Sequence, residues 1–231
     1  MAGNQRWVPL ESNPEVMNKF LASVGVPKTC QITDVYGLDP ELLAMVPRPV
    51  MALLLLFPLN EKIEGYFRQL ESEQKDKEIT PSVYFLKQSV GNACGTIALI
   101  HAVANNLESV ALPEGLLKKF LNETKDLTPD ERATKLETDG GLSAAHEESA
   151  LEGQTEAPSR DEKVDMHFIA LVENHGSLLE LDGRKSCPIN HGVTTRDTFL
   201  EDAAVVCRKL MAVDPEEVHF TLVALVANDE A

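Results

Sequence analysis

Apolar stretches mark the strands that the sequence predicts. The longest run, residues 50–59, is broken by Pro58 and is too short to cross a bilayer, so it indicates a buried central strand. Stretches rich in β-formers predict strands at 82–87, 164–172 and 218–226, and a shorter one at 31–36. LLELD at 178–182 follows the polar turn ENHGS, so it forms a hairpin with 164–172.

Helices are predicted where apolar residues recur every three or four positions behind a capping residue. Asn13 and Pro14 are a typical cap and first helical residue, and the helix would end near Gly25. Asn92 can cap a helix that begins at Ala93, and Thr128 with Glu131 forms a capping-box pattern. Further helices are predicted at 40–46, in the first part of 60–77, at 115–123 and at 198–211.

One long segment, residues 135–163, lacks a clear periodicity. It is polar, small and acidic, and loops of this length are often functional. It leads directly into the strand at 164–172, so we expect it to pass over the site described below. With no repeat and no shift of composition, residues 1–231 are predicted to form one α/β domain.

Charge and cysteine usage narrow the possible partners. The 231 residues are 43% hydrophobic and carry 37 acidic against 21 basic side chains, a net charge of −16. Nucleic acid and anionic membranes are therefore not expected partners, whereas a basic protein segment is. Four widely spaced cysteines and the absence of a secretory leader pattern predict reduced thiols in the cytoplasm.

Cys94 is the strongest nucleophile candidate. It lies in the first turn of the helix predicted after Asn92, where unpaired backbone N–H groups favour a thiolate. The alternative is a cysteine that packs as a small apolar residue. That alternative is favoured for Cys30, Cys187 and Cys207, because none of them opens a helix after a strand.

His167 and Asp182 lie on the two strands of the predicted hairpin. If the turn centres between Asn174 and His175, opposed residues have numbers that sum to 349, and this pair does. A carboxylate opposite an imidazole fixes its tautomer and supports its cationic form, although the pair could equally be a structural hydrogen bond. A slip of one residue would put the two side chains on opposite faces.

Gln88 and the remaining histidines complete the candidates. Gln88 lies at the end of the strand predicted before Cys94, where its amide could stabilise an oxyanion; alone, it would be read as a surface residue. His101 is two helical turns from Cys94, too far for proton transfer, and is predicted to be a packed core histidine. The other four, which have neither a carboxylate in a comparable relation nor metal-ligand spacing, are His146, His175, His191 and His219.

Long motifs resemble the ubiquitin carboxyl-terminal hydrolases, and in particular their broadly expressed short isozyme. QSVGNACGTIALIHAVANN is similar to their cysteine segment, and VDMHFIALV, LLELDGRK and PINHG are similar to their histidine and aspartate segments. MVPRPVMALLLLFP and RWVPLESNPEV match the amino-terminal part, and EGQTEAPS resembles the crossover loop. The resemblance implies a papain-like fold with a mainly antiparallel central sheet, flanking helices and a knotted backbone.

The same resemblance assigns roles to residues. It makes Cys94 the nucleophile, His167 the general base and acid, Asp182 its orienter and Gln88 the oxyanion donor, in a monomer without a cofactor or metal. The implied substrate is the carboxyl terminus of ubiquitin, and some family members also accept Nedd8. The implied substrate contacts are Pro9, Leu10, Glu11, Ser12, Asn13, Pro14, Ala150, Leu151, Glu152, Gly153, Gln154, Thr155, Glu156, Ala157, Glu217, Val218, His219, Phe220, Thr221 and Leu222.

Two other functions fit the residues less well. A ubiquitin-binding protein with little turnover would not need all four catalytic positions, which are intact here. Another Cys-His-Asp enzyme, such as an acyltransferase, would require an acyl acceptor other than water.

Overall fold

The apolar run becomes the central strand β2 (Val50–Pro58) of a six-stranded sheet. The strand order is β1-β6-β2-β3-β4-β5, and every neighbouring pair is antiparallel, which confirms the predicted α/β class. The other strands are β1 (Cys30–Asp34), β3 (Met166–Asn174), β4 (Ser177–Leu181), β5 (Ile189–Val193) and β6 (Thr221–Ala227). The computed structural model describes residues 5–74, 83–154, 158–160, 162 and 164–227.

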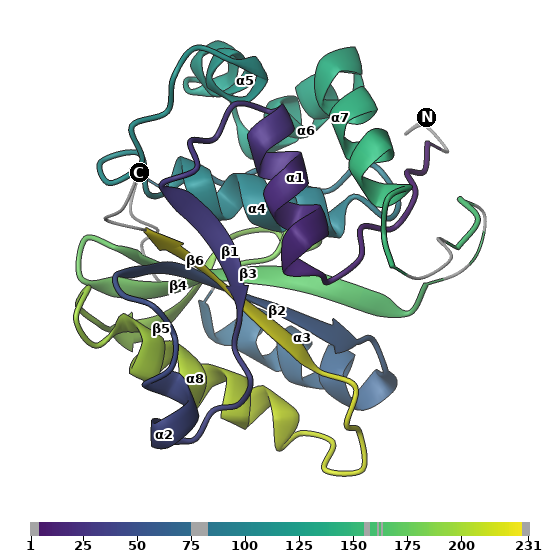
Figure 1. Cartoon of the computed structure of the whole chain (residues 1–231). Helices are drawn as coiled ribbons and strands as arrows, with labels where there is room; N and C mark the ends of the chain where they lie inside the picture. The colour runs from purple at the N-terminus through teal and green to yellow at the C-terminus, as the bar shows by residue number, and fades with distance from the viewer. Residues whose placement is uncertain (1–4, 75–82, 155–157, 161, 163, 228–231) are drawn as a thin grey trace.

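Helices cover both faces of the sheet (Figure 1). One face carries α1 (Pro14–Ser23), α4 (Cys94–Ala104), α5 (Leu116–Thr124), α6 (Pro129–Glu137) and α7 (Gly140–Ala150). The other face carries α2 (Pro40–Leu43), α3 (Glu61–Gln74) and α8 (Phe199–Met211). Within the described residues, no helix combines the length and apolarity needed to cross a membrane.

The central strand is apolar throughout because both of its faces are covered. Leu54 belongs to the core beneath α1 and α4, whereas Leu53 and Phe57 of the same strand belong to the core beneath α3 and α8. All three are buried. A strand in this position must therefore be continuously hydrophobic rather than alternating.

Local capping signals in the sequence are confirmed. The Asn13 carboxamide accepts a hydrogen bond from the Glu15 N–H, and Pro14 is the first residue of α1. Thr128 and Glu131 form both hydrogen bonds of the capping box at α6. These contacts involve only neighbouring residues, so the sequence pattern suffices to specify them.

The strand predicted at 82–87 is wrong. Residues 83–87, the described part of that prediction, belong to no strand, and their backbone groups bond to side chains and to the start of α6 rather than to a neighbouring strand. The Tyr84 N–H donates to the Asn105 carboxamide oxygen and the Leu86 N–H to His101 Nε2, while Arg132 donates to the Phe85 carbonyl. The apolar composition of this segment therefore reflects its burial against helices and not a place in the sheet.

The segment at 135–163 is only partly a loop. Its first residues complete α6, and α7 follows with Asp139 as its cap, accepting hydrogen bonds from the Gly141 and Leu142 N–H groups. The irregular part therefore begins after Ala150.

Two other strands differ from the prediction. The last strand, β6, begins later than predicted, at Thr221. Strand β5 was not predicted, because its polar residues give no strand pattern.

Candidate active site

Cys94 is the first residue of α4 and is half-buried. The predicted cap is wrong: the helix starts one residue later, Ala93 occupies the cap position, and no side chain caps it. Asn92 instead adopts a left-handed conformation, with φ of 63°, and donates from its side chain to the Trp7 carbonyl at 3.1 Å. The predicted placement of the thiol in the first helical turn holds nonetheless.

The amino-terminal segment lies beside this helix start. The Trp7 N–H donates to the Gly91 carbonyl at 2.9 Å. Gly95 packs closely against Leu10, because a Cβ atom at Gly95 would lie 3.1 Å from Leu10 Cβ and would force it to shift. The chain around Leu10 is thereby held against the first turn that carries Cys94.

The hairpin that carries His167 and Asp182 has a different register from the predicted one. Opposed residues such as Ala170 and Leu181 sum to 351 rather than 349. His175 and Gly176 both have positive φ, 47° and 81°, which centres a two-residue turn between them. Because the shift is by two residues, side chains keep the predicted face.

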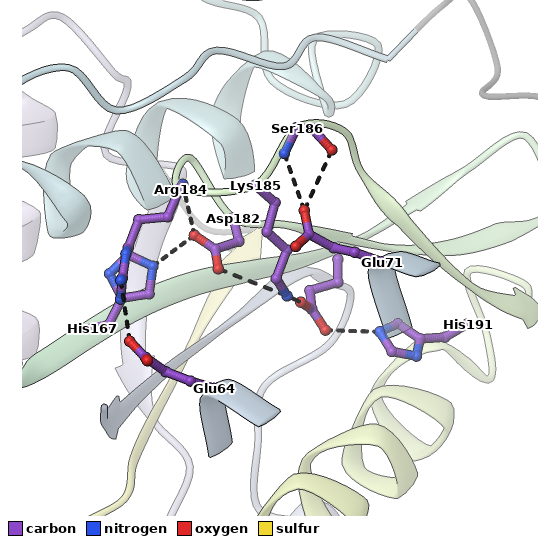
Figure 2. A network of polar contacts seen from close by, with 9 residues as sticks. Glu64, Glu71, His167, Asp182, Arg184, Lys185, Ser186 and His191 are labelled. Carbon is purple, nitrogen blue, oxygen red and sulfur yellow. Dashed lines mark hydrogen bonds and ion pairs between the residues drawn. The ribbon is translucent and has the colours of Figure 1, made fainter. Parts of the chain in front are cut away.

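His167 and Asp182 meet although they are not direct cross-strand partners. His167 Nε2 lies 2.7 Å from Asp182 Oδ1, and both side chains are buried (Figure 2). The Arg184 N–H donates to the same carboxylate oxygen at 2.9 Å. With Nε2 engaged by the carboxylate, Nδ1 is the ring nitrogen left to face a thiol.

Electrostatics at the three residues favours an ion pair. Burial opposes charge on the imidazole, but the Asp182 carboxylate and Cys94 outweigh it and raise the pKa of His167 to about 9. Burial alone would raise the pKa of the Cys94 thiol, yet hydrogen bonding to His167 and the charge of that ring lower it. Despite burial, His167 and Lys185 lower the pKa of Asp182 to about 2. A thiolate beside an imidazolium is the state that these shifts favour.

Gln88 lies at the mouth of the same site. Its backbone N–H donates to the Gly183 carbonyl at 2.8 Å, which joins its segment to the turn after Asp182. One amide hydrogen is used by the Val90 carbonyl at 3.1 Å. A carboxamide has two N–H donors, so the second can serve an oxyanion.

Two clefts meet at Cys94. One, of about 570 Å³, is lined by Gln88, His167 and the carboxylates of Glu61, Glu64 and Asp165. The other, of about 200 Å³, is lined mainly by apolar residues, including Leu56 and Phe168. Asn92, Cys94, Val164 and Met166 line both clefts.

The structure brings some of the expected substrate contacts to these clefts and not others. The smaller cleft is lined by Pro9, Leu10, Glu11, Ser12 and Ala150. Asn13 and Pro14 instead begin α1, and residues 151–154 follow α7, where Gly153 lies against the Glu11 side chain. Thr155, Glu156 and Ala157 lie outside the described residues.

The stretch from Glu217 to Leu222 lines neither cleft. Thr221 and Leu222 begin β6, opposite Leu56 and Leu55, and Leu56 is a wall of the smaller cleft. Glu217, Val218, His219 and Phe220 form the loop before this strand, and Val218 is 75% exposed. This loop is thus at the same end of the sheet as the site, without contributing to its lining.

The other histidines divide into core and surface groups. His101 is fully buried, accepts from the Leu86 N–H at 3.1 Å and stacks on Phe85, so its prediction as a core histidine is confirmed. The expectation that His191 has no carboxylate in a relation comparable to that of His167 is wrong, because His191 Nε2 lies 2.8 Å from Glu180 on the neighbouring strand. His219 Nδ1 lies 2.6 Å from Glu217, but the two residues belong to one loop. These pairs form across strands or within a loop, where sequence spacing gave no guide.

The remaining cysteines lie outside both clefts. Burial raises the pKa of Cys30, and it raises that of Cys207 to about 12. All four cysteines are free thiols, including half-buried Cys187.

Sequence reasoning missed a group of charged residues behind Asp182. Buried Lys185 lies beside the second oxygen of the Asp182 carboxylate (Figure 2). It pairs with buried Glu180, which in turn pairs with the mostly buried His191. One signal was present in the sequence: Glu180 interrupts an otherwise apolar strand. A carboxylate in such a position requires a buried partner.

A cysteine that opens a helix, beside an imidazole held by a buried carboxylate, is the arrangement of a cysteine hydrolase. Comparison with known proteins gives the particular family. Residues 7–212 match the profile described as "Ubiquitin carboxyl-terminal hydrolase, family 1". The chain therefore belongs to this family of cysteine-type deubiquitinating peptidases, as the sequence motifs predicted.

Similar proteins span nearly the whole chain. A ubiquitin carboxyl-terminal hydrolase of Aplysia californica is 52% identical over 94% of this chain and all of that protein. The human isozyme L1 is 46% identical over 94% of this chain and 96% of its own. The crystal structure of the Trichinella spiralis UCH37 catalytic domain bound to ubiquitin vinyl methyl ester has a TM-score of 0.78 at 24% identity, covering 99% and 98% of the two chains. That last similarity supports the fold.

Proposed function

We propose that this enzyme hydrolyses the bond that follows the carboxyl-terminal glycine of ubiquitin, using Cys94, His167 and Asp182. The observation that carries the proposal is the buried His167–Asp182 pair, at 2.7 Å, beside a thiol whose pKa is lowered. Membership of the family supports the substrate.

The proposed reaction passes through an acyl-enzyme. The Cys94 thiolate attacks the glycine carbonyl carbon and forms a C–S bond, while Gln88 and the Cys94 N–H donate to the oxyanion. The C–N bond then breaks, and the His167 imidazolium gives its proton to the leaving amine. Water, deprotonated by His167, attacks the thioester carbonyl and forms a C–O bond. The C–S bond then breaks, the glycine leaves as a carboxylic acid, and the Cys94 thiolate is restored beside the His167 imidazolium.

The clefts suit the tail of ubiquitin, which is basic before its Gly-Gly end. Two glycines have no side chains and can enter the narrow apolar cleft between Leu10 and Phe168. The larger cleft is lined by Glu61, Glu64 and Asp165 together with Arg184, which pairs with Glu64, so its net acidic charge would favour basic residues. We assign substrate contact to Pro9–Ser12 and Ala150 on this basis.

Covalent labelling tests the nucleophile. A ubiquitin carrying a carboxyl-terminal electrophile should label the parent enzyme at one position, and Cys94→Ala should abolish labelling. Cys187→Ala is the matched control, because Cys187 is a half-buried free thiol outside both clefts, and it should label as the parent does. Labelling that survives Cys94→Ala would contradict the proposal. The same probe built on Nedd8 measures whether that modifier is also accepted.

We propose that the segment between Ala150 and Val164, of which residues 155–157, 161 and 163 lie outside the described residues, limits the size of the leaving group. The segment leaves the site at Ala150 and returns at Val164, and both of these residues line the smaller cleft. A chain anchored at both ends beside Cys94 should pass small or unfolded leaving groups and exclude folded ones. Cleavage of folded di-ubiquitin as fast as a small carboxyl-terminal amide would refute this gating. We further propose that the protein is cytoplasmic, in keeping with its four free thiols, and that it is a monomer, as the family resemblance implies.

A further inference from the structure

Lys185 lies buried between two carboxylates behind the active site. Its ammonium is paired with Glu180 Oε1 and lies 3.7 Å from Asp182 Oδ2. The side chains of Lys185 and Asp182 are 5% exposed, and that of Glu180 is 2% exposed. Charges so far from water interact strongly, since little solvent screens them.

The two oxygens of Asp182 face different partners. Oδ1 accepts from His167 Nε2 and from the Arg184 N–H, whereas Oδ2 faces Lys185 (Figure 2). Because the two oxygens of a carboxylate are equivalent, a full exchange would restore these contacts, but a partial rotation would weaken the hydrogen bond to His167. An ammonium on the Oδ2 side opposes that rotation and favours the ionised form.

The position of the ammonium is itself fixed. It lies 3.4 Å from the centre of the Phe67 ring on α3, and the Lys185 backbone N–H donates to the Asp182 carbonyl at 3.0 Å. Glu180 is held in turn by His191 Nε2 at 2.8 Å. Every group in the chain from Asp182 to His191 therefore has a defined partner.

Other titratable groups surround this chain. From α3, Glu64 pairs with Arg184, Glu71 accepts from Ser186, and the Tyr66 hydroxyl lies in the field of Glu180. From α8, Cys207 lies in the same field, and His101 on α4 lies in that of Asp182. Lys185 is the cation that directly bridges the two buried carboxylates.

We propose that Lys185 is a positioning residue, which acts through Asp182 and is balanced by Glu180. This inference rests on the proposed role of the Cys94–His167–Asp182 group. The parent has one negative and one positive charge beside Asp182, from Glu180 and Lys185. Removing the ammonium alone leaves a carboxylate that repels Asp182; removing both charges restores neutrality.

Three variants that remove one or both of these charges test the proposal. In K185M, which keeps the hydrocarbon stem, kcat should fall about tenfold or more with KM little changed, and the acid limb of the kcat/KM profile should move to higher pH. In K185M/E180Q the limb and kcat should recover toward the parent. In E180Q alone, which leaves the ammonium to Asp182, the limb should move to lower pH with kcat retained.

A packing role for Lys185 would give a different pattern. It predicts that K185M has the same kcat and pH profile as the parent per folded molecule, or that the kcat of the double variant is as low as that of K185M. Either result overturns the proposal. An unmoved limb in E180Q also overturns it, so the test stands even if K185M does not fold. Lys119→Met removes an exposed ammonium of α5 that pairs with Glu123, and serves as the matched control.

Active-site titration separates this inference from the proposed function. Each variant is first titrated with the ubiquitin electrophile, so that rates refer to competent enzyme. A parent that does not label through Cys94 would refute the proposed function. A parent that labels, with K185M indistinguishable from it, would refute only the role of Lys185.

Discussion

Asp182→Asn is the sharpest perturbation of the proposed mechanism. Asparagine keeps the size of the side chain and its oxygen beside His167 but removes the charge. In the parent, the pKa of His167 is about 9 instead of 6.5, with Asp182 the strongest favourable contributor. That difference corresponds to roughly 3 kcal/mol in favour of the imidazolium.

The expected loss follows from this free energy. Most of the stabilisation disappears with the carboxylate charge, so kcat/KM at neutral pH should fall about a hundredfold. The high-pH limb of the profile, which reports loss of the imidazolium proton, should also move toward lower pH. Both effects have the same origin and should appear together.

Steady-state hydrolysis of a fluorogenic carboxyl-terminal amide of ubiquitin, from acidic to alkaline pH, measures both quantities. Asp126→Asn is the control, because the Asp126 side chain is 86% exposed and lines neither cleft. If Asp182→Asn kept activity within threefold of the parent, with the limb unmoved, the carboxylate would not be holding an imidazolium.

Two further predictions concern Gln88 and His167. Gln88→Ala should lower kcat by about a hundredfold with little change in KM, since one oxyanion donor is lost. A rise in KM with kcat retained would instead indicate a binding role, and single-turnover rates with the fluorogenic amide decide between the two. His167 gains a proton on folding, because its pKa rises from 6.5 to about 9, so its stabilisation is full below pH 6.5 and is lost as pH rises through 9. Urea unfolding should therefore show a difference in unfolding free energy between parent and His167→Gln that is about 3 kcal/mol larger at pH 6 than at pH 10, and a pH-independent difference would contradict the assigned pKa.

Patterns confined to a few neighbouring residues were predicted well. The Asn13 cap, the Thr128 capping box and the central strand at 50–58 all appear as expected. Each depends on contacts within one turn of helix or on the burial of one strand. The same locality explains why Cys94 could be placed at a helix start.

Patterns that depend on distant partners were predicted less well. Residues 82–87 were read as a strand because of their composition, but their hydrogen-bond partners are the side chains of Asn105 and His101. The hairpin register was off by two residues, because the positive φ values of His175 and Gly176 decide where the turn centres. The prediction that His167 and Asp182 lie close together survived this error, because a shift of two residues leaves both side chains on the same face of the hairpin.

The sequence by itself was enough to indicate the family and to single out the residues proposed for its chemistry, Cys94, His167 and Asp182, because they lie within long motifs. Only the tertiary structure decided how Asp182 is held, because Lys185, Glu180 and His191 act through space and burial. The strength of a charge depends on how much water remains around it, and that depends on the packing of the whole chain.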